Sequence, residues 1–362
     1  NINGKIKNKN GNVLVSNEGD DLLLVDEKGY IDINAGDAKL VNNGNAGIEI
    51  KGVIRGRGNK TIEIDNQNTN ASSVKISQGG LVNNLAGNID IKNKGTNGVL
   101  VEGNVEGELG NININSEKGL IDIASSGVVK INENNKTSDK NIIINNTQEA
   151  SGINIAGTIY NYGVGKTLIT NNGQQGTKVS GTVSNNNGNL DINNTSNKIL
   201  ISGTVENNQG RNNIINTGEN GIEISGNVLN KKGITNIENN NTSDSSKIFI
   251  TVDGKITNNN SDILIKNKGT NSEAGIDIDG LIKAENQNII ITNENSDIVI
   301  GEYASSNDNY ITASNGNVQI NQTNGNILNG IIDTDTVNKN QNHDLENRDQ
   351  AYKTLIKAGK DF

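Results

Sequence analysis

The sequence predicts an all-β fold, a β-solenoid of about 15 coils with a repeat of roughly 22–23 residues. The motif Ile/Val-Ser-Gly-Thr/Asn-Val closes the segments 176–183, 198–205 and 221–228. Between these copies, apolar residues alternate with polar ones, which is the period of a strand. A unit this short cannot bury its apolar face alone, so we expect each unit to stack on its neighbours.

Composition supports a thin core. Hydrophobic residues make up 31% of the chain and aromatic residues 2%, well below the roughly 45–50% apolar content of globular domains. A disordered chain would also have low hydrophobic content. However, Ile, Val and Leu recur at alternating positions instead of being scattered. Because a solenoid core is a narrow column, a few inward β-branched side chains per coil suffice.

The sequence contains no Cys, Met, Trp or Pro. Its formal net charge is −9. Without Cys, the chain forms no disulfide and no Cys-ligated metal site. The absence of Pro suits continuous strand ladders, because Pro lacks the N–H donor. An acidic chain lacks the basic face of a nucleic-acid binder, and no apolar run approaches the roughly 18–20 residues of a membrane helix. We therefore expect neither a nucleic-acid partner nor a membrane span.

Residues 1–46 are expected to form the least regular coils of a repeat domain that covers residues 1–337. The segment 22–25 has four consecutive apolar residues, which predicts a strand covered on both sides or a bulge. Since the chain contains no Met and begins within a repeat, we expect a processed product or an excised fragment.

From Gly47 the coils are regular. Their strands include the segments 48–50, 62–64, 74–76, 99–101, 121–123, 153–155, 276–278 and 298–300. Insertions at 132–140, 239–246 and 270–274 are expected on outer corners. The Asn residues that follow many strands suit corners with left-handed backbone, and on successive coils they could stack into amide ladders.

The repeat fails in the tail, residues 338–362. Leu345, Tyr352, Leu355 and Ile356 have a spacing nearer to that of a helix, among Glu, Gln, Ala and Lys residues. We expect either a short helix that caps the column or a linker to a further segment.

Few residues suit catalysis, and we expect no catalytic residues and no enzyme. The single His, His343, lies in the irregular tail, so no His-based dyad can form within a repeat. The closest carboxylate pairs are Asp277 with Asp279 and Asp333 with Asp335, and such pairs hydrolyse glycosides in other proteins. Alternation would place each pair on one face, pointing outward. The aromatic and basic side chains that bind polysaccharide in β-helix enzymes are scarce here.

No cofactor or metal site is predicted. The segment 79–81, Gly-Gly-Leu, lacks the following Gly and Asp of the calcium-binding nonapeptide, although scattered surface Asp residues could bind Ca²⁺ weakly. The segment 55–58, Arg-Gly-Arg-Gly, is followed by no helix, so we expect a corner loop and not a phosphate loop.

Tyr160 and Tyr162 are the one aromatic pair in the sequence and the only candidate binding residues. Exposed, they could stack on a sugar or on a receptor side chain. Alternatively, they pack at a corner of the solenoid.

The repeat Gly-Ile-x-Ile-x-Gly-x-Val, with a later Gly-Asn-Ile-x-Ile-x-Asn, covers residues 47–330. It resembles the filamentous-haemagglutinin-type exoproteins of bacterial two-partner secretion. The Asn-, Ile- and Lys-rich usage is similar to that of fusobacterial leukotoxins and haemagglutinins. The resemblance implies a right-handed parallel β-helix, export through an outer-membrane secretion partner, and a role in adhesion or toxicity. The secretion domain of the family is not visible, so no residue roles are carried over.

These observations predict part of a large secreted bacterial surface protein, a monomer that forms a rod-like shaft. Its expected partner is a receptor or glycan on the host cell surface, and its expected role is adhesion as a virulence factor. Two alternatives stay open. The shaft could belong to a secreted cytotoxin, a leukotoxin that acts on leukocytes, or the chain could be a carbohydrate-active β-helix enzyme.

Overall fold

The computed structural model describes residues 1–132, 137–147, 151–301, 311–328, 332–333 and 354–357. They form a right-handed parallel β-solenoid of about 12 turns, which confirms the expected fold class. The turn count is lower than the expected 15 because most coils exceed the expected repeat length. Residues at the same position of neighbouring coils are 23 apart for Asp90 and Asn113 but 32 apart for Asp122 and Asn154.

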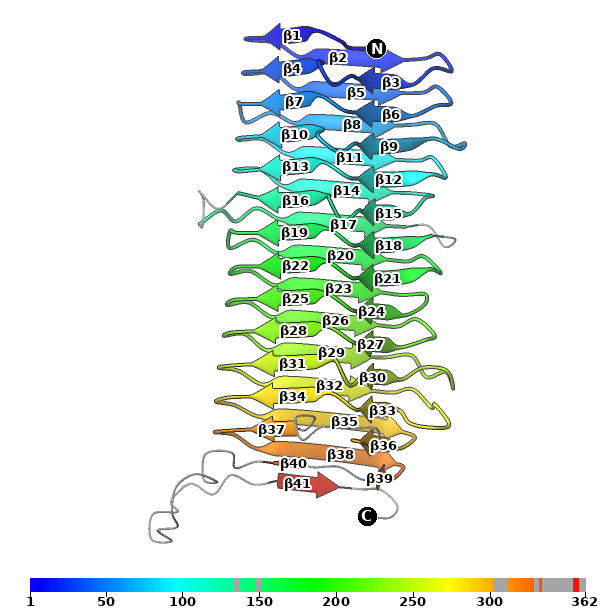
Figure 1. Ribbon diagram of the computed structural model, residues 1–362, viewed down its shortest axis with the longest axis vertical. Helices are drawn as coiled ribbons and strands as arrows, with labels where there is room; N and C mark the ends of the chain where they lie inside the picture. The colour runs from blue at the N-terminus through cyan, green and yellow to red at the C-terminus, as the bar shows by residue number, and fades with distance from the viewer. Residues whose placement is uncertain (133–136, 148–150, 302–310, 329–331, 334–353, 358–362) are drawn as a thin grey trace. The chain divides into compact units, whose positions relative to one another are not determined.

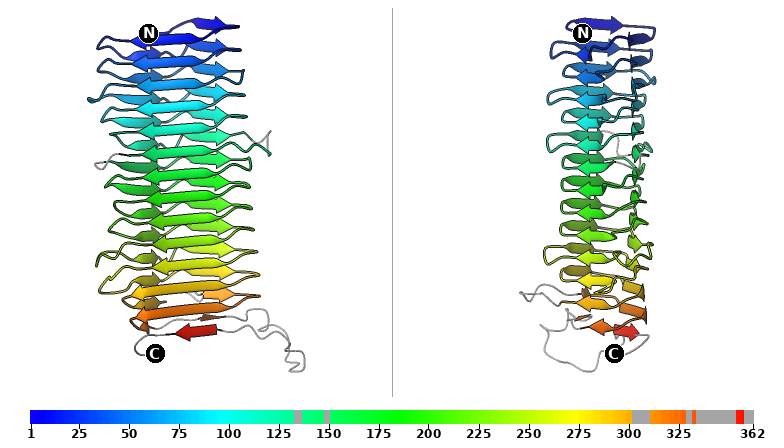
Figure 2. Two further views of the ribbon diagram at one scale, coloured as in Figure 1. Left: turned by 180° about the vertical axis from the view of Figure 1, so that it is seen from behind. Right: turned by 90° about the vertical axis from the view of Figure 1, so that its right-hand side faces the viewer.

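The chain divides into two compact units, residues 1–196 and 197–362, each described by itself. In both, the chain visits three parallel sheets in turn, which we name C, A and B. Sheets A and B lie side by side on the near face in Figure 1, with sheet C behind them. The left panel of Figure 2 shows sheet C from its own side. Each coil is therefore flattened into two layers, and the core lies between them.

The strands of the first unit are short and regular. Sheet C contains β2 (Val13–Asn17), β5 (Ala38–Asn42), β8 (Ile62–Asn66), β11 (Ile89–Asn93), β14 (Ile112–Ser116), β17 (Ile142–Asn146), β20 (Thr167–Asn171) and β23 (Leu190–Asn194). Sheet A contains β3 (Leu23–Val25), β6 (Ile48–Ile50), β9 (Ser73–Ile76), β12 (Gly98–Val101), β15 (Ile121–Ile123), β18 (Gly152–Ile155) and β21 (Gly176–Val179). Sheet B contains β1 (Lys5–Asn8), β4 (Tyr30–Ile33), β7 (Val53–Gly56), β10 (Leu81–Asn84), β13 (Asn104–Gly107), β16 (Val128–Ile131), β19 (Thr158–Asn161) and β22 (Thr182–Asn185).

The second unit repeats the pattern. Sheet A contains β24 (Ile199–Ile201), β27 (Ile222–Ile224), β30 (Ile248–Ile250), β33 (Ile276–Ile278), β36 (Ile298–Ile300) and β39 (Ile327–Leu328). Sheet B contains β25 (Thr204–Asn207), β28 (Asn227–Asn230), β31 (Lys255–Asn258), β34 (Leu281–Ala284), β37 (Ile311–Ala313) and β40 (Ile332–Asp333). Sheet C contains β26 (Asn212–Asn216), β29 (Thr235–Asn239), β32 (Ile263–Asn267), β35 (Ile289–Asn295), β38 (Val318–Asn324) and β41 (Thr354–Lys357).

The core is a set of columns of like residues. The strands pair in register, so Ile91 lies beside Ile64 on one coil and Ile114 on the next, and all three are 0% exposed. Because strand side chains alternate between faces, every second residue joins such a column. Each fully buried aliphatic side chain contributes about 1.5–3 kcal/mol. The core therefore needs no aromatic residue.

Glycine shapes the bend between sheets A and B. Lys51 and Gly52 link β6 to β7, and a Cβ at Gly52 would lie 2.2 Å from the carbonyl oxygen of Gly29 on the previous coil. That distance is shorter than any van der Waals contact. The stacked bends can therefore approach closely only because Gly has no side chain.

The predicted amide ladder is present at the inward fifth position of the sheet C strands. Asn42 Nδ2 donates to Asn66 Oδ1 at 2.9 Å, and Asn66 Nδ2 donates to Asn93 Oδ1 at 2.7 Å. The same position holds Asn146, Asn171 and Asn194 in the first unit, and Asn216, Asn239, Asn267 and Asn293 in the second.

The expected left-handed corners at Asn are wrong. Among the described residues, the one non-Gly residue with a positive φ is Ser296, at 63°. Glycines such as Gly98, at 77°, otherwise occupy that conformation. The Asn side chains instead point inward, where they satisfy backbone carbonyls, as Asn42 does at 2.6 Å from the oxygen of Gly44.

The segment 22–25 also differs from its prediction. Leu23 and Val25 are 4% and 0% exposed, while Leu22 and Leu24 are half-buried. This is ordinary alternation in β3, neither a strand covered on both sides nor a bulge. The run of four apolar residues does not form a fully buried strand, because Leu22 and Leu24 lie on the outer face.

The helix expected in the tail is wrong where the structure describes it. Leu355 and Ile356 belong to β41, which pairs in parallel with β38 beside Gln319 and Ile320. Pairing with an existing sheet edge overrides the helical spacing of the sequence. Leu345 and Tyr352 lie outside the described residues.

Candidate ligand-binding surfaces

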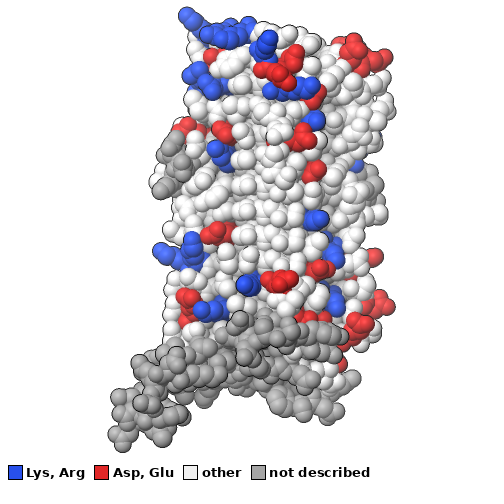
Figure 3. Space-filling view, in the orientation of Figure 1, with Lys and Arg blue, Asp and Glu red and all other residues white. Residues whose placement is uncertain are grey.

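The outward positions of the strands carry the side chains that a ligand could contact. Figure 3 shows the near face, where acidic and basic side chains lie next to each other over the first coils. Few charges lie over β19 and β22. Among the described residues on this face, the view shows no large patch of one sign, so charge alone does not mark a site there.

Several outward charges on the first unit are paired across coils. The carboxylate of Glu63 lies 3.2 Å from Nζ of Lys39 and 2.7 Å from Nζ of Lys92. Burial raises the pKa of Glu63, but the hydrogen bonds from Lys92 and Lys39 outweigh it and hold the pKa below its ordinary 4.5. The same hydrogen bond to Glu63 raises the pKa of Lys92. These groups stabilise each other and have little capacity left for a ligand.

Tyr160 and Tyr162, the predicted binding pair, stack on each other. Their ring centroids are 3.6 Å apart and their planes make an angle of 24°. Tyr160 lies on the outer face of β19, and Tyr162 follows the end of that strand. Both side chains are half-buried. Each ring covers one face of the other. A role in stacking on a sugar or receptor stays a prediction.

The carboxylate pairs are not arranged as the sequence predicts. Asp277 lies on the outer face of β33 and pairs with Lys247 at 3.5 Å. Asp279 is 4% exposed, so the expectation that both carboxylates point outward is wrong. The reason is that β33 ends at Ile278, and the alternation ends with it. Asp335 and His343 lie outside the described residues, as does the side chain of Asp333.

The glycine-rich segment 55–58 differs in part from the predicted corner loop. Arg55 and Gly56 belong to β7, so the corner begins only at Arg57, which pairs with Asp32 at 3.0 Å. Gly79 takes a positive φ of 85° in its turn. Among the described residues, no group of three or more His, Cys, Asp or Glu side chains is placed to hold a metal ion.

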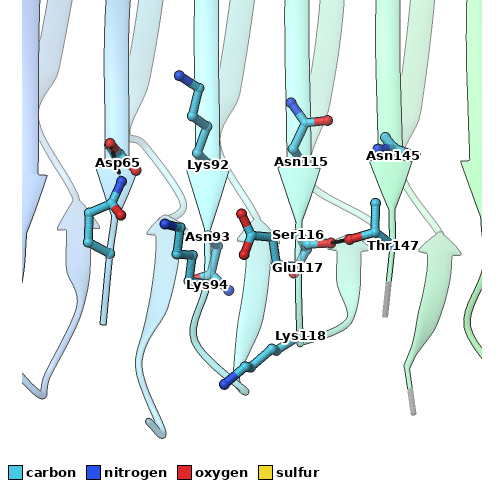
Figure 4. A pocket seen from close by; sticks show the side chains of 11 residues that line it. Asp65, Lys92, Asn93, Lys94, Asn115, Ser116, Glu117, Lys118, Asn145 and Thr147 are labelled. Carbon is cyan, nitrogen blue, oxygen red and sulfur yellow. Dashed lines mark hydrogen bonds between the residues drawn. The ribbon is translucent and has the colours of Figure 1, made fainter. Parts of the chain in front are cut away.

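A shallow groove of about 710 Å³ lies on the outer face of sheet C in the first unit. Figure 4 shows its side chains, which come from the ends of four successive strands and the turns after them. Asp65, Lys92, Asn115 and Asn145 hold the same strand position on successive coils. The groove is thus a set of polar columns.

Asp65 is the most unusual residue of this groove. It is 4% exposed, and its Oδ2 accepts a hydrogen bond from Nε2 of Gln67. Its Oδ1 is buried and has no hydrogen-bond donor. Sequence reasoning missed this site. Aligning the coils residue by residue would have shown the polar column, although not the buried oxygen.

A second groove, of about 320 Å³, lies on the second unit. There, Nζ of Lys247 lies 4.9 Å from the ring centre of Phe249, and Lys198 pairs with Glu223 at 2.7 Å. Since Lys247 also pairs with Asp277, the charged groups of this groove already have partners.

No family model, curated protein or solved structure matches this chain. The resemblance to haemagglutinin-type exoproteins therefore stays a prediction. A search of the described residues found no helix with the length and hydropathy needed to cross a membrane.

Proposed function

We propose that this chain is a stretch of the shaft of a secreted bacterial surface protein and contributes to adhesion to host cells as a virulence factor. The supporting observation is the in-register repetition of coils, which places like residues above one another on every outward face. Each added coil extends such a stack by about 4.8 Å. Repetition of this kind suits a rigid spacer that also offers a long, polar binding surface.

The sequence pattern supports export as part of this proposal. A chain without Cys can cross a membrane as an extended polypeptide without misplaced disulfides. We propose two-partner secretion through an outer-membrane protein, a location at the cell surface or outside the cell, and a monomeric state. We assign the chain no reaction, because the residues that could support catalysis are paired, buried or outside the described residues.

The test is cell binding by the purified, fluorescently labelled chain. We expect saturable binding to epithelial cells or leukocytes, measured by flow cytometry, with cell viability unchanged. The heat-denatured chain, labelled in the same way, is the control for non-specific attachment.

Two outcomes would overturn the proposal. Killing of leukocytes by the chain alone would make it part of a cytotoxin. A lack of binding to either cell type would leave a spacer whose adhesive region lies elsewhere.

A further inference from the structure

The groove beside Asp65 differs from the parts of the first unit where outward charges form ion pairs. In those parts, charges on adjacent coils meet, as Lys130 and Glu106 do at 3.3 Å. In the groove, no side-chain hydrogen bond or ion pair is described for four lining residues. These are Lys94, Asn115, Glu117 and Asn145. Donors and acceptors thus lie next to each other with their hydrogen-bonding capacity unused.

The buried oxygen of Asp65 is a second, independent observation. A carboxylate oxygen without a donor costs free energy, because burial removes its water and nothing replaces it. Such a group in a native structure calls for an explanation. Since Asp65 lines the groove, a rotation of its carboxylate toward the groove would let a ligand there supply the missing N–H or O–H donor.

We propose that this groove binds a neutral, hydroxyl-rich oligosaccharide that lies across successive coils. One sugar hydroxyl donates to Oδ1 of Asp65, while the amides of Asn115 and Asn145 donate to and accept from hydroxyls farther along the chain. The coil spacing of about 4.8 Å is comparable with the length of a pyranose unit in an extended glycan. The inference rests on the proposed adhesive role and names the ligand class for it.

Charge balance favours a neutral sugar over other ligands. Asp65 and Glu117 are acidic while Lys94 and Lys118 are basic, and the third lysine, Lys92, is already paired with Glu63. The groove therefore attracts neither polyanions nor polycations strongly. A metal ion would need more acidic ligands than the described residues bring together. The groove contains no aromatic side chain, so hydrogen bonds and not stacking must select the ligand.

The test uses the neutral tetrasaccharide lacto-N-neotetraose as a probe of the full chain, by isothermal titration calorimetry and saturation-transfer NMR. We expect saturable binding by the wild-type chain. Asp65→Asn replaces the free acceptor by a donor and keeps an acceptor for Gln67, so binding should weaken about tenfold, or about 1.4 kcal/mol. Asn115→Ala should weaken binding in the same direction.

Asp65→Asn should also raise the melting temperature, because it removes a buried negative charge whose Oδ1 accepts no hydrogen bond. A purely structural role for Asp65 predicts the opposite change. The matched control is Asn193→Ala, which alters the same strand position on β23, outside the groove. This control should bind the probe as the wild type does.

Three outcomes would overturn the inference. These are no binding of the tetrasaccharide, equal binding by Asp65→Asn, and tighter binding of a heparin-derived tetrasaccharide than of the neutral probe. Cell binding separates this inference from the proposed function. If Asp65→Asn adheres to host cells as the wild type does, adhesion stands and only the groove's role fails. If neither protein adheres but the wild type binds the probe, the groove stands and the adhesive role fails.

Discussion

At the residue scale, the buried Asn side chains give this solenoid its regularity. Asn171 is 0% exposed, and its Nδ2 donates to Oδ1 of Asn194 at 2.6 Å and to the oxygen of Gly173 at 2.9 Å. Its own Oδ1 accepts from Asn146 at 3.0 Å. One side chain therefore connects three coils and closes a turn.

Replacing Asn171 by Leu should destabilise the fold by about 1–3 kcal/mol for each buried polar group left without its partner. Urea denaturation followed by circular dichroism measures the loss. The matched control is Thr170→Ala on the outer face of the same strand, which should change stability by less than about 0.5 kcal/mol. Equal effects of the two substitutions would contradict the ladder's role.

Glu63 should make stability depend on pH. Its folded pKa is depressed by Lys92 and Lys39, so its contribution is present above the ordinary value of 4.5 and is lost as pH falls through the lower folded value. Glu63→Gln should therefore be less stable than the wild type at pH 7, by about 0.2–1 kcal/mol for a partly exposed pair. Below the folded pKa the two proteins should converge.

Urea denaturation between pH 2 and pH 7 checks this convergence. Glu27→Gln, at an exposed position, is the control and should follow the wild type throughout. A constant difference between wild type and Glu63→Gln at all pH values would show that packing, not charge, causes the effect.

At the element scale, short bends determine how closely coils stack. Gly52 lies between β6 and β7, and a Cβ there would lie 2.2 Å from the oxygen of Gly29 and 2.3 Å from that of Asp26. Both contacts are to backbone, which cannot move without separating the coils.

Gly52→Ala should therefore destabilise the chain by several kcal/mol, within the range of the most severe single substitutions. The control is Gly4→Ala, because a Cβ at Gly4 meets nothing within 4 Å. Thermal melts monitored by circular dichroism compare the two variants. The steric explanation fails if Gly52→Ala melts within a degree or two of Gly4→Ala.

At the scale of the whole molecule, stability is local, because each coil contacts chiefly its neighbours. Ile144 of β17 is 0% exposed and lies in register with Ile114 and Ile169, whereas Ile143 lies on the outer face. Damage to one coil should therefore spread to adjacent coils before distant ones.

Ile144→Ala should cost about 2–5 kcal/mol, and Ile143→Ala much less. Hydrogen exchange read by mass spectrometry should show the largest loss of protection in β17 and its neighbours β14 and β20. Within the same unit, distant strands such as β5 should lose little. Uniform loss across the first unit would instead indicate a single cooperative block.

The sequence by itself determined the fold class, because the strand alternation and the recurring Gly and Asn positions define one coil. A single coil can bury its apolar face only by stacking on another coil. It also predicted the amide ladder. It could not decide that Asn42 points inward instead of forming a corner, since both arrangements place Asn at the end of a strand.

Only the tertiary structure decided which residues meet across coils. Insertions vary the spacing between paired residues from 21, for Ile311 and Ile332, to 36, for Val318 and Thr354. The cross-coil partner of a residue such as Glu63 or Asp122 therefore cannot be read from a fixed repeat. The ion pairs of Glu63 with Lys39 and Lys92, and the hydrogen bond between Asn154 and Asp122, depend on atoms brought together by that register. The local pattern sets which face a side chain takes, whereas its neighbours on that face depend on how many residues each corner holds.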